Sequence, residues 1–243
     1  MDLKEFFDKY RKVALGFSGG ADSSFLLYEG RRLGADIKPY YVRTCFQPSF
    51  EYHDALRMAG DVEIILMDIL QDEKVRRNQQ DRCYYCKMHI FEAISARAHA
   101  DGYTAVIDGT NASDDAEDRP GMKALENLGV LSPLRMCGLT KDEIRIRSKE
   151  AGLFTWNKPA YACLATRITA GNEIDEDTLR RIEKCEEELM NCGFSDFRIR
   201  VDKGNASIYI SRKQREKAEY ERDNILRTVS AHFPLQTEEI YWR

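Results

Sequence analysis

Residues 18–24, the string Ser-Gly-Gly-Ala-Asp-Ser-Ser, combine serine hydroxyls, paired glycines and a carboxylate. Adjacent glycines let a backbone adopt positive φ and approach an anion closely. Hydroxyls and the first N–H groups of a following helix can then donate to phosphate oxygens. The string has neither the lysine of a G-x-x-x-x-G-K-[ST] loop nor a G-x-G-x-x-G pattern. It predicts a phosphate-binding loop of another kind, and the alternative is a plain Gly-Gly turn with Asp22 or Ser23 as a helix N-cap.

Three of the seven cysteines lie in strings that could bind a metal or react. Cys83 and Cys86 form a C-x-x-C pair at the start of a predicted helix, directly before Lys87. Such a pair can be a zinc half-site, a redox pair, two ligands of an iron–sulfur cluster or chemically inert, and the lack of a second C-x-x-C weakens the zinc interpretation. Cys163 lies in Lys-Pro-Ala-Tyr-Ala-Cys-Leu-Ala-Thr-Arg (158–167), whose basic residues would favour a thiolate.

The remaining cysteines are interpreted as incidental thiols. An odd number of cysteines in a chain without an export signal argues against a disulfide framework. Cys45 is the strongest exception, since it follows a predicted strand at the edge where ligands bind. The four are Cys45, Cys137, Cys185 and Cys192.

Short β-type runs alternate with charged amphipathic stretches through the first two-thirds of the chain. The alternation predicts βαβ units, and hence a Rossmann-like α/β fold with a parallel sheet and helices on both faces. Ligands of such sheets bind beyond the carboxyl ends of the strands, so the loops after Phe17, Arg43 and Asp108 should contain the chemistry. The runs are KVALGF (12–17), IKPYYVR (37–43), VEIILM (62–67) and TAVID (104–108).

The pattern changes after about residue 170. A long acidic helix is predicted at about 174–191 and a charged helix at about 213–230, with β-like runs at 197–201 and 206–210 and near the C-terminus. We therefore expect a first domain at 1–170, which contains the phosphate-binding loop, and a small α+β domain at 171–243 for substrate binding or oligomerisation.

Composition favours a small-molecule substrate. The chain has 243 residues, of which 43% are hydrophobic and 32% charged, and its net charge is −4. A slightly acidic chain lacks the positive field that usually accompanies nucleic-acid binding. No apolar run approaches 18 residues, and the N-terminus is amphipathic with mixed charge. We expect a cytoplasmic protein without a nucleic-acid or membrane partner.

The S-G-G-x-D-S string after the first strand resembles the pyrophosphate loop of the PP-loop ATPases. Members of that superfamily use ATP to adenylylate a substrate and release pyrophosphate. The resemblance implies that Mg²⁺ shields the β- and γ-phosphates within the loop. The residues that would surround the phosphates are Ser18, Gly19, Gly20, Asp22, Ser23 and Ser24.

Further strings follow in a fixed order along the chain. They are R-C-Y-Y-C-K (82–87), D-G-T-N (108–111), D-D (114–115), D-R-P-G (118–121), Glu126, S-P-L (132–134) and K-P-A-Y-A-C-L-A-T-R (158–167). With the loop, this set resembles the LarE family of sulfur transferases over about residues 13–201. The resemblance implies adenylylation of a carboxylate on a pyridinium dicarboxylate mononucleotide, a precursor of the nickel-pincer nucleotide cofactor, followed by replacement of AMP by sulfur.

Two sulfur sources are known in that family, and both use the cysteine that corresponds to Cys163. In one, the cysteine gives up its own sulfur and becomes dehydroalanine. In the other, three cysteines bind a [4Fe–4S] cluster whose fourth iron carries an exogenous sulfide. The presence of Cys83 and Cys86 fits the cluster version, since three thiolates leave one iron open. The donor of the sulfide is left open.

The rest of the site is implied by the same resemblance. Lys87 matches a basic residue of the family's site. Arg198 and Arg200 match an R-x-R strand that binds the substrate phosphate, and strand alternation puts both on one side. A solvated strand face is the alternative. The family's strand continues into a His-Gly-Asp turn that is replaced here by residues 201–205, Val-Asp-Lys-Gly-Asn, which leaves the contacts at that end open.

The aspartates after TAVID could all be N-caps and turn formers. Their place after a strand favours a role near the nucleotide or its metal, and only Asp108 is taken as a candidate. The others are Asp114, Asp115 and Asp118.

Three other functions remain open from the sequence. A PP-loop tRNA thiolase would usually have a basic or zinc-bearing RNA module, which the C-terminal part lacks. An ammonia-using, amide-forming synthetase would leave the cysteines incidental. A regulatory module would bind ATP without releasing pyrophosphate. Assembly into a homo-oligomer is implied by the resemblance.

Overall fold

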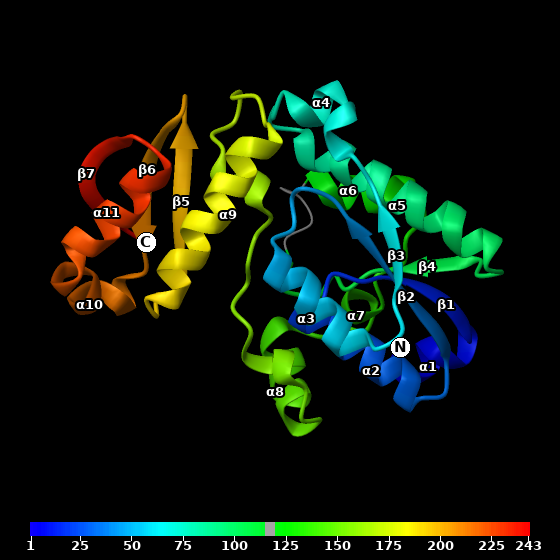
Figure 1. The fold of residues 1–243 in the computed structure, drawn as a ribbon. Coiled ribbons are helices and arrows are strands. Elements are labelled where there is room, and N and C mark those ends of the chain that lie inside the picture. The colour runs from blue at the N-terminus through cyan, green and yellow to red at the C-terminus, as the bar shows by residue number, and fades with distance from the viewer. Residues whose placement is uncertain (115–119) are drawn as a thin grey trace. The chain divides into compact units, whose positions relative to one another are not determined.

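The computed structural model describes residues 1–114 and 120–243, and this part of the chain divides into two compact units (Figure 1). The first unit contains residues 1–69 and 81–160. The second contains residues 70–80 and 161–243. No helix in the described ranges is both long and apolar enough to cross a bilayer.

A four-stranded, all-parallel sheet forms the centre of the first unit, and the predicted fold class is confirmed. The strand order is β3-β2-β1-β4, with β1 paired to β2 from Lys12 opposite Asp36 and to β4 from Val13 opposite Ala105. The four strands coincide with the four predicted runs. They are β1 (Lys12–Gly16), β2 (Asp36–Arg43), β3 (Glu63–Leu66) and β4 (Ala105–Ile107).

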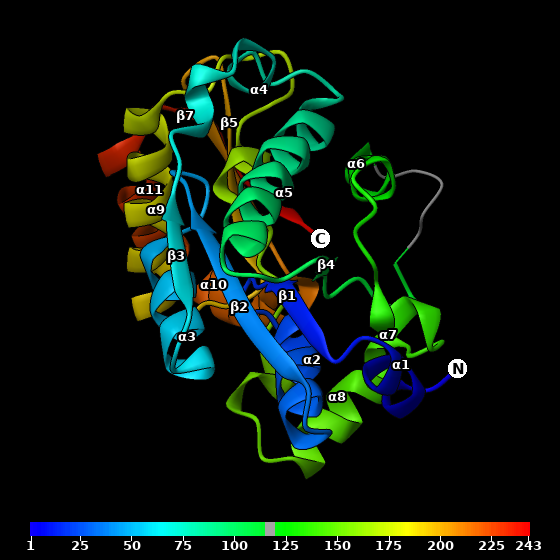
Figure 2. The same cartoon turned by 90° about the vertical axis from the view of Figure 1, so that its right-hand side faces the viewer.

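Helices cover both faces of this sheet because its strands are apolar on both sides. On one face, Leu15 and Phe17 pack with residues of α2 such as Phe25. On the other, Ala14 and Val42 pack against α5, which Figure 2 shows running along the sheet. The helices are α1 (Leu3–Lys9), α2 (Ala21–Arg32), α3 (Ser49–Ala59), α5 (Arg82–Ala100), α6 (Pro120–Asn127), α7 (Pro133–Met136) and α8 (Lys141–Glu150), with a 3₁₀ turn η2 (Phe154–Asn157).

The second unit is α+β, with a three-stranded sheet in the order β5-β6-β7. Strand β6 runs antiparallel to β5 and parallel to β7. Its apolar face packs on α9 and α11, and the predicted helix at 213–230 is broken at Glu221 into two helices. The elements are α4 (Glu73–Arg76), η3 (Leu164–Arg167), α9 (Glu176–Asn191), β5 (Phe197–Asp202), β6 (Asn205–Ile210), η4 (Arg212–Gln214), α10 (Arg215–Tyr220), α11 (Arg222–His232) and β7 (Leu235–Trp242); the turn η1 (Ile69–Gln71) spans the boundary.

Residues 70–80 belong to the second unit although they interrupt the first in sequence. The Asn78 side chain, 2% exposed, donates from Nδ2 to the carbonyls of Ile168 (3.1 Å) and Thr169 (3.0 Å). The carbonyl of Asn78 in turn accepts from the Gly171 amide at 2.8 Å. These contacts explain why residues 70–80 pack with the second unit and not with the residues next to them in sequence, since a buried carbonyl needs a donor.

Replacement of Asn78 by Ala should destabilise the second unit by about 1–3 kcal/mol, because two carbonyls lose their donor. The measurement is urea unfolding followed by tryptophan fluorescence and circular dichroism. Lys4→Ala, which removes an exposed ion pair with Asp8, is the control and should change the unfolding free energy by less than about 0.5 kcal/mol. Equal midpoints for the two variants would contradict the assigned role of Asn78.

Candidate functional site

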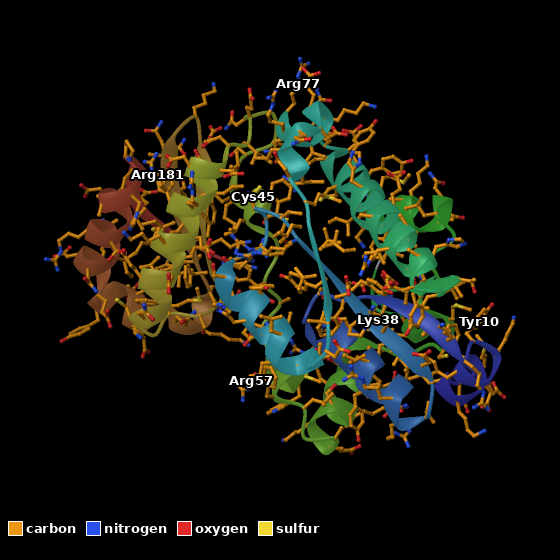
Figure 3. All side chains as sticks on the ribbon, turned by 45° about the vertical axis from the view of Figure 1, so that its right-hand side comes forward. Tyr10, Lys38, Cys45, Arg57, Arg77 and Arg181 are labelled. Atoms are coloured by element: carbon orange, nitrogen blue, oxygen red, sulfur yellow. The ribbon has the colours of Figure 1, made fainter. Side chains whose placement is uncertain are left out.

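Strands β1 and β4 lie side by side, but the helices that follow them pack on opposite faces of the sheet: α2 after β1 on one face, and α6 after β4 on the other. In parallel α/β sheets this arrangement leaves a crevice beyond the strand ends. A cavity of about 490 Å³ lies there, entirely within the first unit. Figure 3 shows this edge of the sheet by Cys45, which follows β2, while Lys38 marks the opposite end of that strand. Predicted site residues that line the cavity are Ser18, Asp22, Ser23, Cys83, Lys87 and Asp108.

The loop between β1 and α2 is fixed by glycine geometry and by its own serines. Gly19 has φ +72°, and a Cβ there would lie 2.7 Å from the Cβ of Ala55 on α3. The hydroxyls of Ser18 and Ser23 lie 3.1 Å apart, and the Gly20 amide donates to the Ser18 hydroxyl at 3.3 Å. The loop therefore presents hydroxyls and the N-terminal amides of α2, which suit an anion.

Asp22 is bound to a lysine that comes from far along the chain. Its Oδ2 lies 2.5 Å from the Nζ of Lys141, the first residue of α8, across 119 residues of sequence. Among the described residues its Oδ1 is buried without a hydrogen-bond partner. A cation absent from the loop's own sequence is thus supplied by another helix.

Asp108 organises the loop after β4. Its carboxylate, on a residue only 4% exposed, accepts from the Thr110 hydroxyl at 2.5 Å, the Thr110 amide at 3.2 Å and the Ser132 hydroxyl at 2.7 Å. Gly109 lies so close to the start of α2 that an added Cβ would be 2.9 Å from the Ser23 nitrogen. Asp108 thereby positions the β4 loop against the phosphate loop.

The C-x-x-C pair lies in the first turns of α5, as predicted, and Cys83 and Cys86 share one face because they are three residues apart. The exposed Cys83 accepts a hydrogen bond from Arg82 at 3.5 Å and lines the cavity, whereas the half-buried Cys86 is outside that lining. One turn after Cys83, Lys87 also lines the cavity, with its stem packed over Gly121 of α6.

Cys163 lies directly before η3 in the second unit, and the side chain of Arg167, at the end of η3, donates hydrogen bonds to the backbone around it. The Arg167 side chain is 1% exposed, and its Nη1 donates to the carbonyls of Ala162 (2.7 Å) and Cys163 (3.4 Å). Its Nε and Nη2 each donate at 3.0 Å to the buried carboxylate of Glu186 on α9. Burial alone would lower the pKa of Arg167, but the bonds and charge of Glu186 raise it above its ordinary value.

Arg198 and Arg200 lie on one side of β5 in the same unit. Arg198 is half-buried and has no ion-pair partner within the described part of the chain, and its pKa is lowered by burial and then by the positive charges of Arg243, Arg167 and Arg200. Arg200 lies over the Tyr209 ring at 5.3 Å from its centroid. A guanidinium surrounded by like charges is stabilised by an anion.

The predicted residues thus fall into two groups, one in each unit. The first unit contains the phosphate loop, Asp108, Lys87 and the C-x-x-C pair, and the second contains Cys163 with Arg198 and Arg200. Gly19 and Gly20 shape the loop behind the cavity lining, and the Ser24 hydroxyl is buried without a partner in the described residues. Asp115 and Asp118 lie outside the described residues.

Two residues of these groups escaped prediction from the sequence. Lys141 has no local pattern that connects it with the loop 119 residues earlier. Glu186 could have been found, because it interrupts the apolar stripe of α9. The buried residues of that helix are Leu179, Ile182, Cys185, Glu186 and Leu189.

The side chains at these positions have the chemical groups that the implied metals prefer. The buried, unpartnered Oδ1 of Asp22 suits a hard cation such as Mg²⁺, and the paired thiols of α5 suit iron. Within the described residues, no group of three or more His, Cys, Asp or Glu side chains is gathered for a metal.

The parallel sheet, the S-G-G-x-D-S loop after β1 and the cavity at the strand ends define an α/β protein of the PP-loop type. No protein-family model matches the sequence. The chain is 32% identical to an uncharacterized protein of Methanocaldococcus jannaschii, over 86% of this chain and 81% of that protein. It is 30% identical to an uncharacterized protein of Synechocystis sp., over 88% and 81%.

A third relative has a name that states an activity. It is the pyridinium-3,5-bisthiocarboxylic acid mononucleotide synthase of Lactiplantibacillus plantarum, 28% identical over 82% of this chain and 74% of that enzyme. The protein belongs to the LarE family of sulfur transferases.

Gly19→Ala should lower the free energy of unfolding by about 2–4 kcal/mol, through positive φ and the clash with Ala55. Gly20→Ala is the matched control, since Gly20 has φ −76° and an added Cβ would meet only the Ser18 hydroxyl at 3.4 Å. We expect a loss of about 1 kcal/mol or less for Gly20→Ala. Thermal and urea unfolding measure these differences. Similar losses of unfolding free energy for both variants would contradict the described loop geometry.

Proposed function

We propose that the protein is an ATP-dependent sulfur transferase that converts a carboxylate of a pyridinium-3,5-dicarboxylate mononucleotide into a thiocarboxylate. The observation that supports this most is the single cavity lined by both the phosphate loop and the Cys83–Lys87 turn of α5. A site that only bound ATP would not require cysteine beside the phosphates. The name of the Lactiplantibacillus plantarum relative supports the choice of substrate.

The first step is adenylylation. A carboxylate oxygen of the substrate attacks the α-phosphorus of ATP, the α–β bond breaks, and pyrophosphate leaves with the electron pair. The phosphate loop binds the β- and γ-phosphates through Ser18, Ser23 and backbone amides, and Lys141 offsets their charge. Asp22 would hold a Mg²⁺, which would shield the same charge. Lys87 also lines the cavity, and its ammonium group suits the α-phosphate or the substrate carboxylate.

The second step replaces AMP by sulfur. A sulfur nucleophile adds to the acyl carbon, the carbon–oxygen bond to AMP breaks, and AMP leaves with that electron pair. Adenylylation makes this exchange feasible, because AMP is a far better leaving group than an oxide. Arg198 and Arg200 bind the substrate phosphate, a role that suits the unpaired charge of Arg198.

We also propose that Cys83, Cys86 and Cys163 bind a [4Fe–4S] cluster. Bound by three thiolates, such a cluster has one open iron and supplies a site for an exogenous sulfide. If no cluster forms, Cys163 remains as a sacrificial sulfur donor. We further propose that the protein works in the cytoplasm and that it assembles into a homo-oligomer.

Incubation with ATP, Mg²⁺, sulfide and the dicarboxylate mononucleotide should release pyrophosphate and AMP and form a thiocarboxylate detectable by mass spectrometry. Lys141→Met should lower kcat/KM for ATP about tenfold or more, because the charge beside Asp22 is lost. Lys149→Met, on the same helix with its Nζ over Trp156, is the control and should retain activity. Product formed from ammonia instead of sulfide would indicate an amide-forming synthetase.

Anaerobically purified protein should contain about four irons and acid-labile sulfide per chain, and Cys83→Ala, Cys86→Ala and Cys163→Ala should each lose them. Cys192→Ala is the control and should keep its iron. A colourless protein that stays without iron after reconstitution would refute the cluster. A mass loss of one H₂S at Cys163 after turnover would then identify the sacrificial version.

A further inference from the structure

One buried carboxylate in the second unit contacts both segments to which the proposed sulfur transfer assigns a role. Glu186 is fully buried, and its two oxygens accept from Nε and Nη2 of Arg167 at 3.0 Å each. The Tyr161 hydroxyl donates to its Oε2, and the Ile199 amide donates to its Oε1 at 3.1 Å. These four bonds join helix α9 to the Cys163 segment on one side and to strand β5 on the other.

The bonds on the cysteine side fix the backbone around Cys163. Arg167 uses its remaining nitrogen, Nη1, to donate to the carbonyls of Ala162 and Cys163 and to the Thr166 hydroxyl at 3.1 Å. Its guanidinium also lies over the Tyr161 ring, 4.3 Å from the centroid. The planar fork of arginine can make all these bonds at once, which a lysine cannot.

The bond on the strand side falls between the two arginines proposed to bind phosphate. Ile199 lies directly between Arg198 and Arg200 in β5, and its amide points away from β6 toward Glu186. Displacement of this amide would move both arginines together. Glu186 is therefore the side chain that joins the Cys163 segment to the part of β5 between the two arginines, beside the backbone bond from the Thr169 amide to the Val201 carbonyl at 3.0 Å.

We propose that Glu186, acting through Arg167, is a positioning residue that sets the spacing between Cys163 and the Arg198–Arg200 strand. This inference rests on the proposed function for its kinetic consequence. A buried ion pair is costly to desolvate and is a weak source of stability, so a purely apolar contact would serve folding as well. A fully bonded charged network instead specifies one geometry, which transfer of sulfur to a bound carbonyl requires.

The test compares Arg167→Lys with Arg181→Lys at a temperature well below the Tm of both. Arg181 lies on α9, the helix that contains Glu186 (Figure 3). Its guanidinium donates to the His232 carbonyl and covers the Phe233 ring, away from the Cys163 segment. We expect Arg167→Lys to lower kcat for thiocarboxylate formation about tenfold or more, with KM for the dicarboxylate mononucleotide within about twofold. Glu186→Gln should lower kcat and also raise KM, because the strand contact is weakened too. Arg181→Lys should change neither.

Equal kcat values for Arg167→Lys and Arg181→Lys, per folded molecule, would overturn the proposal. Hydrogen exchange of the peptide that covers residues 160–168 gives a second measurement that needs no activity. Exchange there should be faster in Arg167→Lys than in wild type and unchanged in Arg181→Lys. If the wild type forms no thiocarboxylate, the proposed function has failed, and the exchange comparison alone decides: equal exchange in both variants refutes the positioning role.

Discussion

All four strands of the first unit point the same way, and the placement of its chemistry depends on that constraint. Parallel strands bring their carboxyl ends to one edge, and the order β3-β2-β1-β4 puts the first and last strands side by side. The loops after β1 and β4 therefore meet, with Gly109 packed on the backbone of Ser23. A helix N-terminus, three acidic residues and Cys83 then line one cavity as a consequence of the strand order.

In the second unit, side-chain hydrogen bonds position the predicted site residues. Its sheet is mixed and small, so strand direction does not gather loops at one edge. A buried Arg167–Glu186 pair instead bonds a loop, a helix and a strand together. Such a pair tolerates burial only when nearly every donor and acceptor is satisfied, and here both oxygens of the carboxylate and all three guanidinium nitrogens are bonded.

Local sequence patterns were sufficient for the strands, the glycine-rich turn between β1 and α2 and the helix that begins at the C-x-x-C pair, because each depends on residues close together in sequence. Contacts between distant residues were not predictable in the same way. Lys141 resembles any lysine at a helix start, and nothing near Asn78 indicates that it leaves the first unit. Glu186 could have been predicted in part. The charged residues around it suggest exposure to solvent, yet its position in the apolar stripe of α9 indicates burial. The helix at 213–230 was wrong as one piece, since the chain turns at Glu221.

Residues 70–80 make the second unit discontinuous, and this affects how the protein can be made. Asn78 and its acceptor Ile168 are 90 residues apart, so on the ribosome the segment must wait for most of the first unit to be synthesised before its partners emerge. A C-terminal piece that starts at residue 161 would lack the donor for the carbonyls of Ile168 and Thr169 and the acceptor for the Gly171 amide. In evolution, this unit cannot be moved to another gene as one contiguous exon-like block.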